Sequence, residues 1–262
     1  MTLPIYQVDA FASKLFSGNP AAVVPLDKWL DDETMQKIAA ENNLAETAFF
    51  VKENEYYHIR WMTPIKEVNL CGHATLASAY VIFNFIEKEI EKINFISRSG
   101  ILSVEKNNNY LTLDFPVNYP QPTERPKILS QCFDREPIEI LEGGEYLFLV
   151  FDSEDYIRNL KPNFDLLKQL HPIHMIVTAR GKEVDFVSRM FAPNLGINED
   201  PVTGSAHTVL TPYWSSKLGK QKLVANQLSE RGGELICEIS NDRVKISGQA
   251  VLYLTGKLFL YF

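Results

Sequence analysis

Cysteine is scarce in this chain of 262 residues, and positive charge is outnumbered, with 26 Lys and Arg against 33 Asp and Glu. The three cysteines are odd in number and lie far apart, at positions 71, 132 and 237. This spacing predicts no disulfide framework and favours a reducing, cytoplasmic compartment. The formal net charge of −7 and the lack of a basic run argue against a nucleic-acid partner. A small anionic substrate remains compatible with this charge, because backbone N–H groups can bind an anion locally.

Long apolar runs are missing as well. The most apolar helical stretch, residues 74–86, is too short and too interrupted to span a membrane. The first residues show no basic segment followed by an apolar core, so no signal peptide is predicted. No phosphate-binding loop, dinucleotide fingerprint, nucleophile elbow or metal-ligand spacing occurs. We therefore expect no membrane partner and no metal, nucleotide or organic cofactor.

An internal repeat is the main organisational signal. Arg60-Trp61-Met62-Thr63-Pro64 resembles Arg189-Met190-Phe191-Ala192-Pro193, and residues 97–105 resemble residues 230–238. Matches in the same order at nearly constant offset indicate that the two halves arose by duplication. Gly72 and Gly204 are 132 positions apart, three more than Arg60 and Arg189, so the second copy carries a three-residue insertion, which we place around Glu199-Asp200-Pro201.

Each half reads as strands and helices in the same order. Residues 31–41 predict an amphipathic helix, and residues 72–85, apolar on every side, predict a helix inside a core. The corresponding helix of the second copy contains Pro212, which predicts a kink or a restart. The expected fold is α/β (α+β), with two pseudo-symmetric domains, each a curled, mostly antiparallel sheet wrapped around a central helix. We place the domains at 1–116 and 128–262, with a proline-rich linker at 117–127; the last strand is a candidate to pair with the first domain.

Two short segments, each just before a predicted helix, are the best candidates for a binding site. They are Cys71-Gly72-His73-Ala74-Thr75 and Glu199 to His207. The N-terminus of a helix offers unpaired N–H groups and the positive end of a dipole. Two such ends, one from each half, would bind a small anion. The candidate substrate-binding residues are Cys71, Gly72, Thr203, Gly204, Ser205 and Asn19.

Three side chains are candidates for acid–base chemistry. Glu46 lies between a helix end and an apolar strand, where exclusion of water would raise its pKa and make it a proton carrier; alternatively it is a solvated loop residue. His73 would bind a carboxylate or relay a proton, or simply cap a helix. Asp200 would act as a second acid–base or orienting group, although Asp-Pro is also a common turn.

The ordered set of motifs resembles one known family over nearly the whole chain. The motifs are Asp9-Ala10-Phe11 with Gly18-Asn19-Pro20, residues 44–49, residues 70–75, residues 199–207, residues 229–235 and residues 247–250. Together they resemble the PhzF family of phenazine biosynthesis-like proteins, in the diaminopimelate epimerase superfamily. The resemblance implies a site in the cleft between two similar domains, and a homodimer.

The resemblance also implies site roles. Epimerase relatives exchange protons through two cysteines; here Cys71 holds the first position and Thr203 the second, which argues against a two-thiol racemase. PhzF-like members use a glutamate as proton carrier, at the position of Glu46, and His73, Asp200 and Ser205 match other polar site residues. Ala45, Lys66 and Asn69 depart from the usual family pattern, which puts the phenazine precursor itself in doubt as substrate.

The sequence thus predicts a cofactor-independent isomerase in which Glu46 shifts a carbon-bound proton in a small carboxylate-bearing metabolite. Two alternatives stay open at this point. One is a metabolite-binding protein of the same fold without turnover. The other is a racemase or epimerase that depends on Cys71 and a non-cysteine partner.

Overall fold

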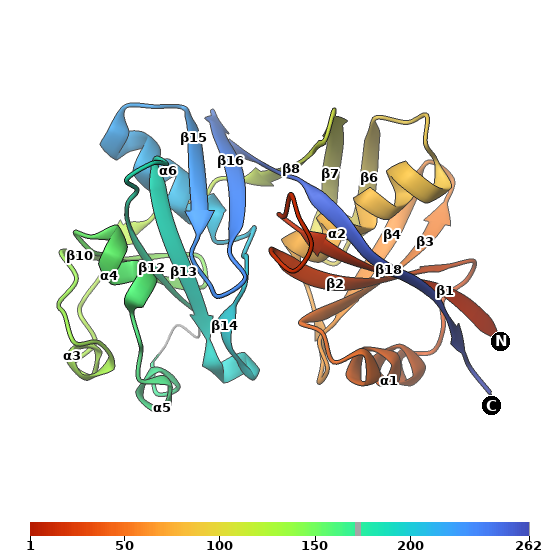
Figure 1. The fold of residues 1–262 in the computed structure, drawn as a ribbon, viewed down its shortest axis with the longest axis horizontal. Helices are drawn as coiled ribbons and strands as arrows, with labels where there is room; N and C mark the ends of the chain where they lie inside the picture. The colour runs from red at the N-terminus through yellow and green to blue at the C-terminus, as the bar shows by residue number, and fades with distance from the viewer. Residues whose placement is uncertain (171–173, 262) are drawn as a thin grey trace. The chain divides into compact units, whose positions relative to one another are not determined.

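A computed structural model describes residues 1–170 and 174–261. It divides into unit 1, residues 1–114 and 247–262, and unit 2, residues 115–246. Figure 1 labels many of the elements of both. The elements of unit 1 are β1 (Thr2–Ala10), β2 (Asn19–Leu26), α1 (Asp32–Asn42), β3 (Glu46–Glu53), β4 (Tyr56–Met62), β5 (Glu67–Val68), α2 (Gly72–Val81), the π-helix η1 (Ile82–Ile86), β6 (Lys92–Ser97), β7 (Gly100–Asn107), β8 (Tyr110–Pro116, which ends in unit 2) and β18 (Ala250–Phe259).

Unit 2 follows in one continuous stretch of chain. Its elements are β9 (Gln121–Pro122), α3 (Leu129–Cys132), β10 (Glu139–Gly143), β11 (Tyr146–Val150), α4 (Glu154–Asn159), α5 (Phe164–Leu167), β12 (His174–Arg180), β13 (Phe186–Ala192), the 3₁₀ helix η2 (Pro193–Leu195), β14 (Ile197–Asp200), α6 (His207–Leu218), β15 (Lys222–Gln227), β16 (Gly233–Ser240) and β17 (Arg243–Gly248, which ends in unit 1).

Strand pairing repeats between the two units. In unit 1, β1 pairs antiparallel with β2, β2 parallel with β3, β3 antiparallel with β4, β4 parallel with β6 and β6 antiparallel with β7. In unit 2, β10, β11, β12, β13, β15 and β16 pair in the same order with the same directions. The repeated topology confirms the predicted fold class of two related, mostly antiparallel sheets.

Two features bear on the predicted domain limits. The final strand β18 pairs antiparallel with β1, from Thr2 opposite Phe259 to Ala10 opposite Ala250. The segment predicted as a linker contains β9, which pairs with β10 inside unit 2. Strand β18 therefore belongs to the sheet of unit 1, while the limits at 116 and 128 stay a prediction.

The central helix α2 is buried on nearly every side, as its apolar sequence predicts. All its residues except Tyr80 are buried, and it packs against β1, β2 and β3. The predicted exposed helix is α1, whose first turn is capped by Asp31 accepting from the Thr34 N–H at 2.8 Å. Unit 1 thus places the N-terminus of α2 within its core, where polar groups must find partners.

The prediction of a kink or restart at Pro212 is wrong in one respect, because α6 is a single helix from His207 to Leu218. Proline lacks the N–H that would bond the Thr208 carbonyl. That carbonyl instead accepts from the Asn118 N–H at 3.1 Å, and Asn118 Nδ2 donates to Thr208 Oγ1 at 3.1 Å. The segment beside β8 therefore supplies the hydrogen bond that the proline removes.

The three-residue insertion lies in a hairpin turn rather than around Glu199-Asp200-Pro201. Trp61 is opposite Val68 in unit 1, and the corresponding Met190 is opposite Asp200 in unit 2. The extra residues fall in the connection between those strands, where η2 and Gly196 form the turn. Glu199 is then the counterpart of Glu67, and Asp200 replaces a valine.

Candidate functional site

The structure gathers Asn19, Glu46, Cys71 and His73 in unit 1. Glu46 is the first residue of β3 and pairs in register with Ala21 of β2. Cys71 precedes α2, and His73 is its second residue. Asn19 begins β2 directly after Gly18, whose φ of +68° suits glycine.

His73 is the centre of this group. Its Nε2 lies 3.2 Å from Glu46 Oε2, while its Nδ1 lies 3.1 Å from Asn19 Nδ2 and 3.5 Å from Cys71 Sγ. The side chains of His73 and Glu46 are 5% and 14% exposed. The ring is therefore contacted at both nitrogens, with Nε2 facing the Glu46 carboxylate.

Burial and charge act in opposite directions on this histidine. Burial alone would lower the pKa of His73, but the neighbouring Cys71 sulfur and the Glu46 carboxylate outweigh it and raise the pKa well above 6.5. Burial raises the pKa of the Cys71 thiol to about 11, and the Glu46 charge adds to that rise. A pKa of about 11 leaves the Cys71 thiol neutral at pH 7, which disfavours Cys71 as the nucleophile or base. The charge that favours a proton on His73 at that pH is the Glu46 carboxylate.

The same three residues also bring together donor atoms that suit a metal ion. Each residue offers one ligand atom, and these atoms, a carboxylate oxygen of Glu46, Sγ of Cys71 and a ring nitrogen of His73, all lie within 4.8 Å of one another. An oxygen, a sulfur and a nitrogen donor form a set that zinc accepts. The sequence spacing gave no sign of this group, because its members come from β3 and from the start of α2.

The second candidate group lies in unit 2, where Asp200 ends β14. Asp200 Oδ2 accepts from Thr203 Oγ1 at 2.5 Å, and both residues are buried. Ser205 Oγ lies 2.8 Å from Tyr146 Oη. Gly204 and Ser205 directly precede α6, which begins at His207. The chain at Gly204 forms a turn, in which the His207 N–H donates to the Gly204 carbonyl at 3.0 Å.

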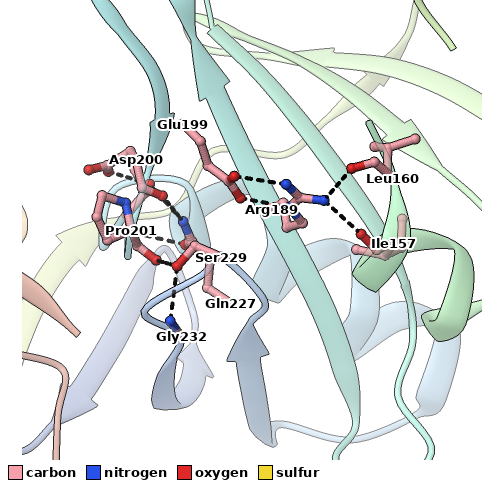
Figure 2. Close-up of polar contacts among 10 residues, drawn as sticks. Ile157, Leu160, Arg189, Glu199, Asp200, Pro201, Gln227, Ser229 and Gly232 are labelled. Atoms are coloured by element: carbon pink, nitrogen blue, oxygen red, sulfur yellow. Dashed lines mark hydrogen bonds and ion pairs between the residues drawn. The ribbon is translucent and has the colours of Figure 1, made fainter. Parts of the chain in front are cut away.

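Gln227 is the partner that the sequence did not reveal. Figure 2 shows it beside Asp200, with Ser229 bonded to the Pro201 carbonyl and to the Gly232 N–H. Gln227 ends β15, 24 residues after Thr203, and its side chain reaches the loop across that separation. The one available signal was its place two residues before the motif at residues 229–235.

His207 has a structural role that makes stability depend on pH. Burial lowers its pKa to about 4, partly offset by its contact with the Thr203 carbonyl, 2.9 Å from Nδ1. Because the unfolded histidine binds a proton near pH 6.5, the stabilising contribution is present above pH 6.5 and is lost as pH falls toward 4. We expect the loss to be on the order of 2–3 kcal/mol.

Urea denaturation at a series of pH values checks this expectation. A His207→Leu variant should show a flatter profile between pH 6.5 and 4 than the unmutated protein. His73, with its raised pKa, contributes stability that is present below pH 6.5 and lost as pH rises through its folded-state pKa. The two effects therefore fall in separate pH ranges, and equal slopes in both proteins below pH 6.5 would contradict the assignment to His207.

The comparisons agree with the resemblance. Residues 8–256 match the family described as "Phenazine biosynthesis-like protein". A Pseudomonas aeruginosa protein named an uncharacterized isomerase is 50% identical over 260 residues, which cover 99% of this chain and all of that protein. The mouse phenazine biosynthesis-like domain-containing protein 1 is 40% identical, covering 98% of this chain and 99% of that one.

Solved structures show the same relationship. A crystal structure of a PhzF family protein from Enterococcus faecalis has a TM-score of 0.96 and 48% identity, covering 99% of this chain and all of that one. A probable proline racemase from Agrobacterium radiobacter shares the fold alone, with a TM-score of 0.69, 8% identity, and coverage of 99% and 93%. No helix among residues 1–170 and 174–261 has the length and apolar character of a membrane span. The chain belongs to the PhzC-PhzF family of phenazine biosynthesis-like proteins.

Proposed function

We propose that this protein is an isomerase that moves a carbon-bound proton in a small carboxylate-bearing metabolite, with Glu46 as the proton carrier. One observation carries the proposal. Glu46 is a carboxylate of low exposure whose Oε2 lies 3.2 Å from His73 Nε2 and receives no well-directed hydrogen bond within the described residues. The relatives named isomerases support the reaction class.

The chemistry follows from the protonation states of this pair. Glu46 in its ionised form takes a proton from carbon and returns it to another carbon, which shifts a double bond or tautomerises the substrate. Once Glu46 has taken the proton and become neutral, a proton-bearing His73 stabilises the negative charge that develops on the substrate as an enolate. Asp200 and Ser205 serve the same reaction by orienting polar groups of the substrate, as their match to the family site implies.

Deuterium exchange tests the proposal directly. The protein is mixed in D₂O with a panel of small unsaturated and amino carboxylic acids and followed by NMR. Uptake at one carbon with the unmutated protein, and not with Glu46→Gln, supports proton-transfer catalysis. Line broadening without uptake favours the alternative of a metabolite-binding protein.

The thiol alternative has its own test in the same assay. A Cys71→Ala variant is expected to retain most of the exchange activity, because the raised pKa keeps the thiol neutral. Loss of exchange in Cys71→Ala, with the fold intact by circular dichroism, would instead favour the Cys71-dependent racemase.

A further inference from the structure

The loop that carries Asp200 is held from two directions. Asp200 directly follows Glu199. The Glu199 carboxylate accepts hydrogen bonds from Arg189 Nε at 2.6 Å and from Arg189 Nη2 at 2.8 Å. The remaining guanidinium nitrogen, Nη1, donates to the carbonyls of Ile157 at 3.2 Å and Leu160 at 2.7 Å, at the end of α4. Figure 2 shows the guanidinium between the carboxylate and these two carbonyls. This two-point contact fixes the backbone immediately before Asp200.

Gln227 holds the loop from the other direction. It is 1% exposed, and its Oε1 accepts from the Thr203 N–H at 2.8 Å. Its Nε2 donates to the Asp200 carbonyl at 2.8 Å and to Thr203 Oγ1 at 3.2 Å. Because Oγ1 receives this hydrogen bond, its own hydrogen is free to point to Asp200 Oδ2, 2.5 Å away. The orientation of the carboxylate therefore depends on Gln227 through Thr203.

Unit 1 contains the same Arg–Glu contact at the corresponding place. Arg60 donates from Nε to Glu67 Oε1 at 2.8 Å and from Nη2 to Oε2 at 2.7 Å. Glu67 lies four residues before Cys71, as Glu199 lies four residues before Thr203. Both copies of the duplicated fold thus hold the start of the loop that leads to their candidate site residues.

We propose that Gln227 and the Arg189–Glu199 pair are positioning residues that set the orientation of the Asp200 carboxylate. The part that Asp200 plays in the reaction rests on the proposed function; its positioning does not. Gln227 acts through Thr203 on one side of Asp200, and the ion pair acts through the backbone on the other.

The test measures Asp200 itself. Protein labelled with ¹³C at the aspartate side-chain carboxyl carbon is titrated by NMR, and Asp200→Asn assigns the signal. In Gln227→Leu, the Thr203 hydroxyl loses the donor that orients it, so the hydrogen bond that it donates to Asp200 Oδ2 weakens. The Asp200 signal should therefore titrate at higher pH. Exchange of the Thr203 amide should be about two- to tenfold faster, the factor that corresponds to one hydrogen bond.

A matched control separates positioning from general loss of stability. Leu223→Ala truncates a fully buried side chain on the same strand, β15, and should lower the melting temperature without moving the Asp200 titration. An unchanged Asp200 titration in Gln227→Leu, or an equal change in Leu223→Ala, would overturn the proposal. If Gln227→Leu does not fold, Glu199→Gln provides the same test, and an unmoved titration there also overturns it.

The result can be told apart from failure of the proposed function. Full exchange activity in Asp200→Asn would show that the reaction does not need Asp200. The titration shifts in Gln227→Leu and Glu199→Gln would still support the positioning role. If Asp200→Asn is inactive but the Asp200 titration is unchanged in Gln227→Leu and Glu199→Gln, the proposed function stands and the positioning role is rejected.

Discussion

Replacement of Glu46 by glutamine is expected to slow proton exchange about 100- to 10,000-fold while ligand binding is retained, because that factor is what a placed general base typically contributes. Glutamine has nearly the same shape and still contacts His73 Nε2, 3.2 Å away in the unmutated protein. It cannot accept a proton from carbon at neutral pH. The measurement is the rate of deuterium uptake by NMR, with binding followed separately by line broadening.

Glu53→Gln is the matched control for this variant. Glu53 lies at the other end of the same strand, β3, and its side chain is 51% exposed. It should exchange protons at the rate of the unmutated protein. Full activity in Glu46→Gln, or an equal loss of activity in Glu53→Gln, would contradict the proposed role of Glu46.

Arg189→Met is expected to lower the free energy of unfolding by about 3–5 kcal/mol, since removing one partner of a buried ion pair leaves the other charge without compensation. The side chains of Arg189 and Glu199 are only 11% and 20% exposed, and the carbonyls of Ile157 and Leu160 lose their donor as well. Urea denaturation, read as the change in transition midpoint at constant slope, measures the effect.

The duplicated copy supplies the control. Arg60→Met removes the corresponding arginine of unit 1, but Arg98 Nη2 remains 2.7 Å from Glu67 Oε2. The loss there should be smaller, because the carboxylate keeps a cation. The double variant Arg189→Met/Glu199→Leu should recover part of the stability. Equal losses at Arg189 and Arg60 would contradict the argument.

Local sequence patterns were sufficient for much of the fold. The apolar run from Gly72 and the capped helix after Asp31 both form as predicted, because burial and capping are decided within a few residues. The repeat gave the common topology of both units. The position predicted for the three-residue insertion was wrong, because the repeat shows only that three extra residues lie between Pro193 and Gly204. The strand register, which only the structure provides, places them in the turn before β14.

The site was predictable only in part. The motifs indicate Glu46, His73 and Asn19, and the structure brings Glu46 and Asn19 each within hydrogen-bonding distance of His73. Gln227 and Tyr146 escaped notice because each reaches its partner across a long separation in sequence, 24 residues to Thr203 and 59 to Ser205. Contacts of this kind depend on which strands are neighbours, and a single sequence carries no direct sign of that.

The pairing of β18 with β1 also sets an order of assembly during synthesis. The ribosome releases β1 early, but the strand that borders it arrives only after all of unit 2 has been made. Unit 2 is continuous and can complete its own pairing first, since domains generally fold as they emerge. In that interval the outer edge of Thr2–Ala10 offers unpaired backbone groups, which can recruit a strand from another chain. Nascent chains that pause before residue 250 therefore carry an unpaired strand edge that favours aggregation.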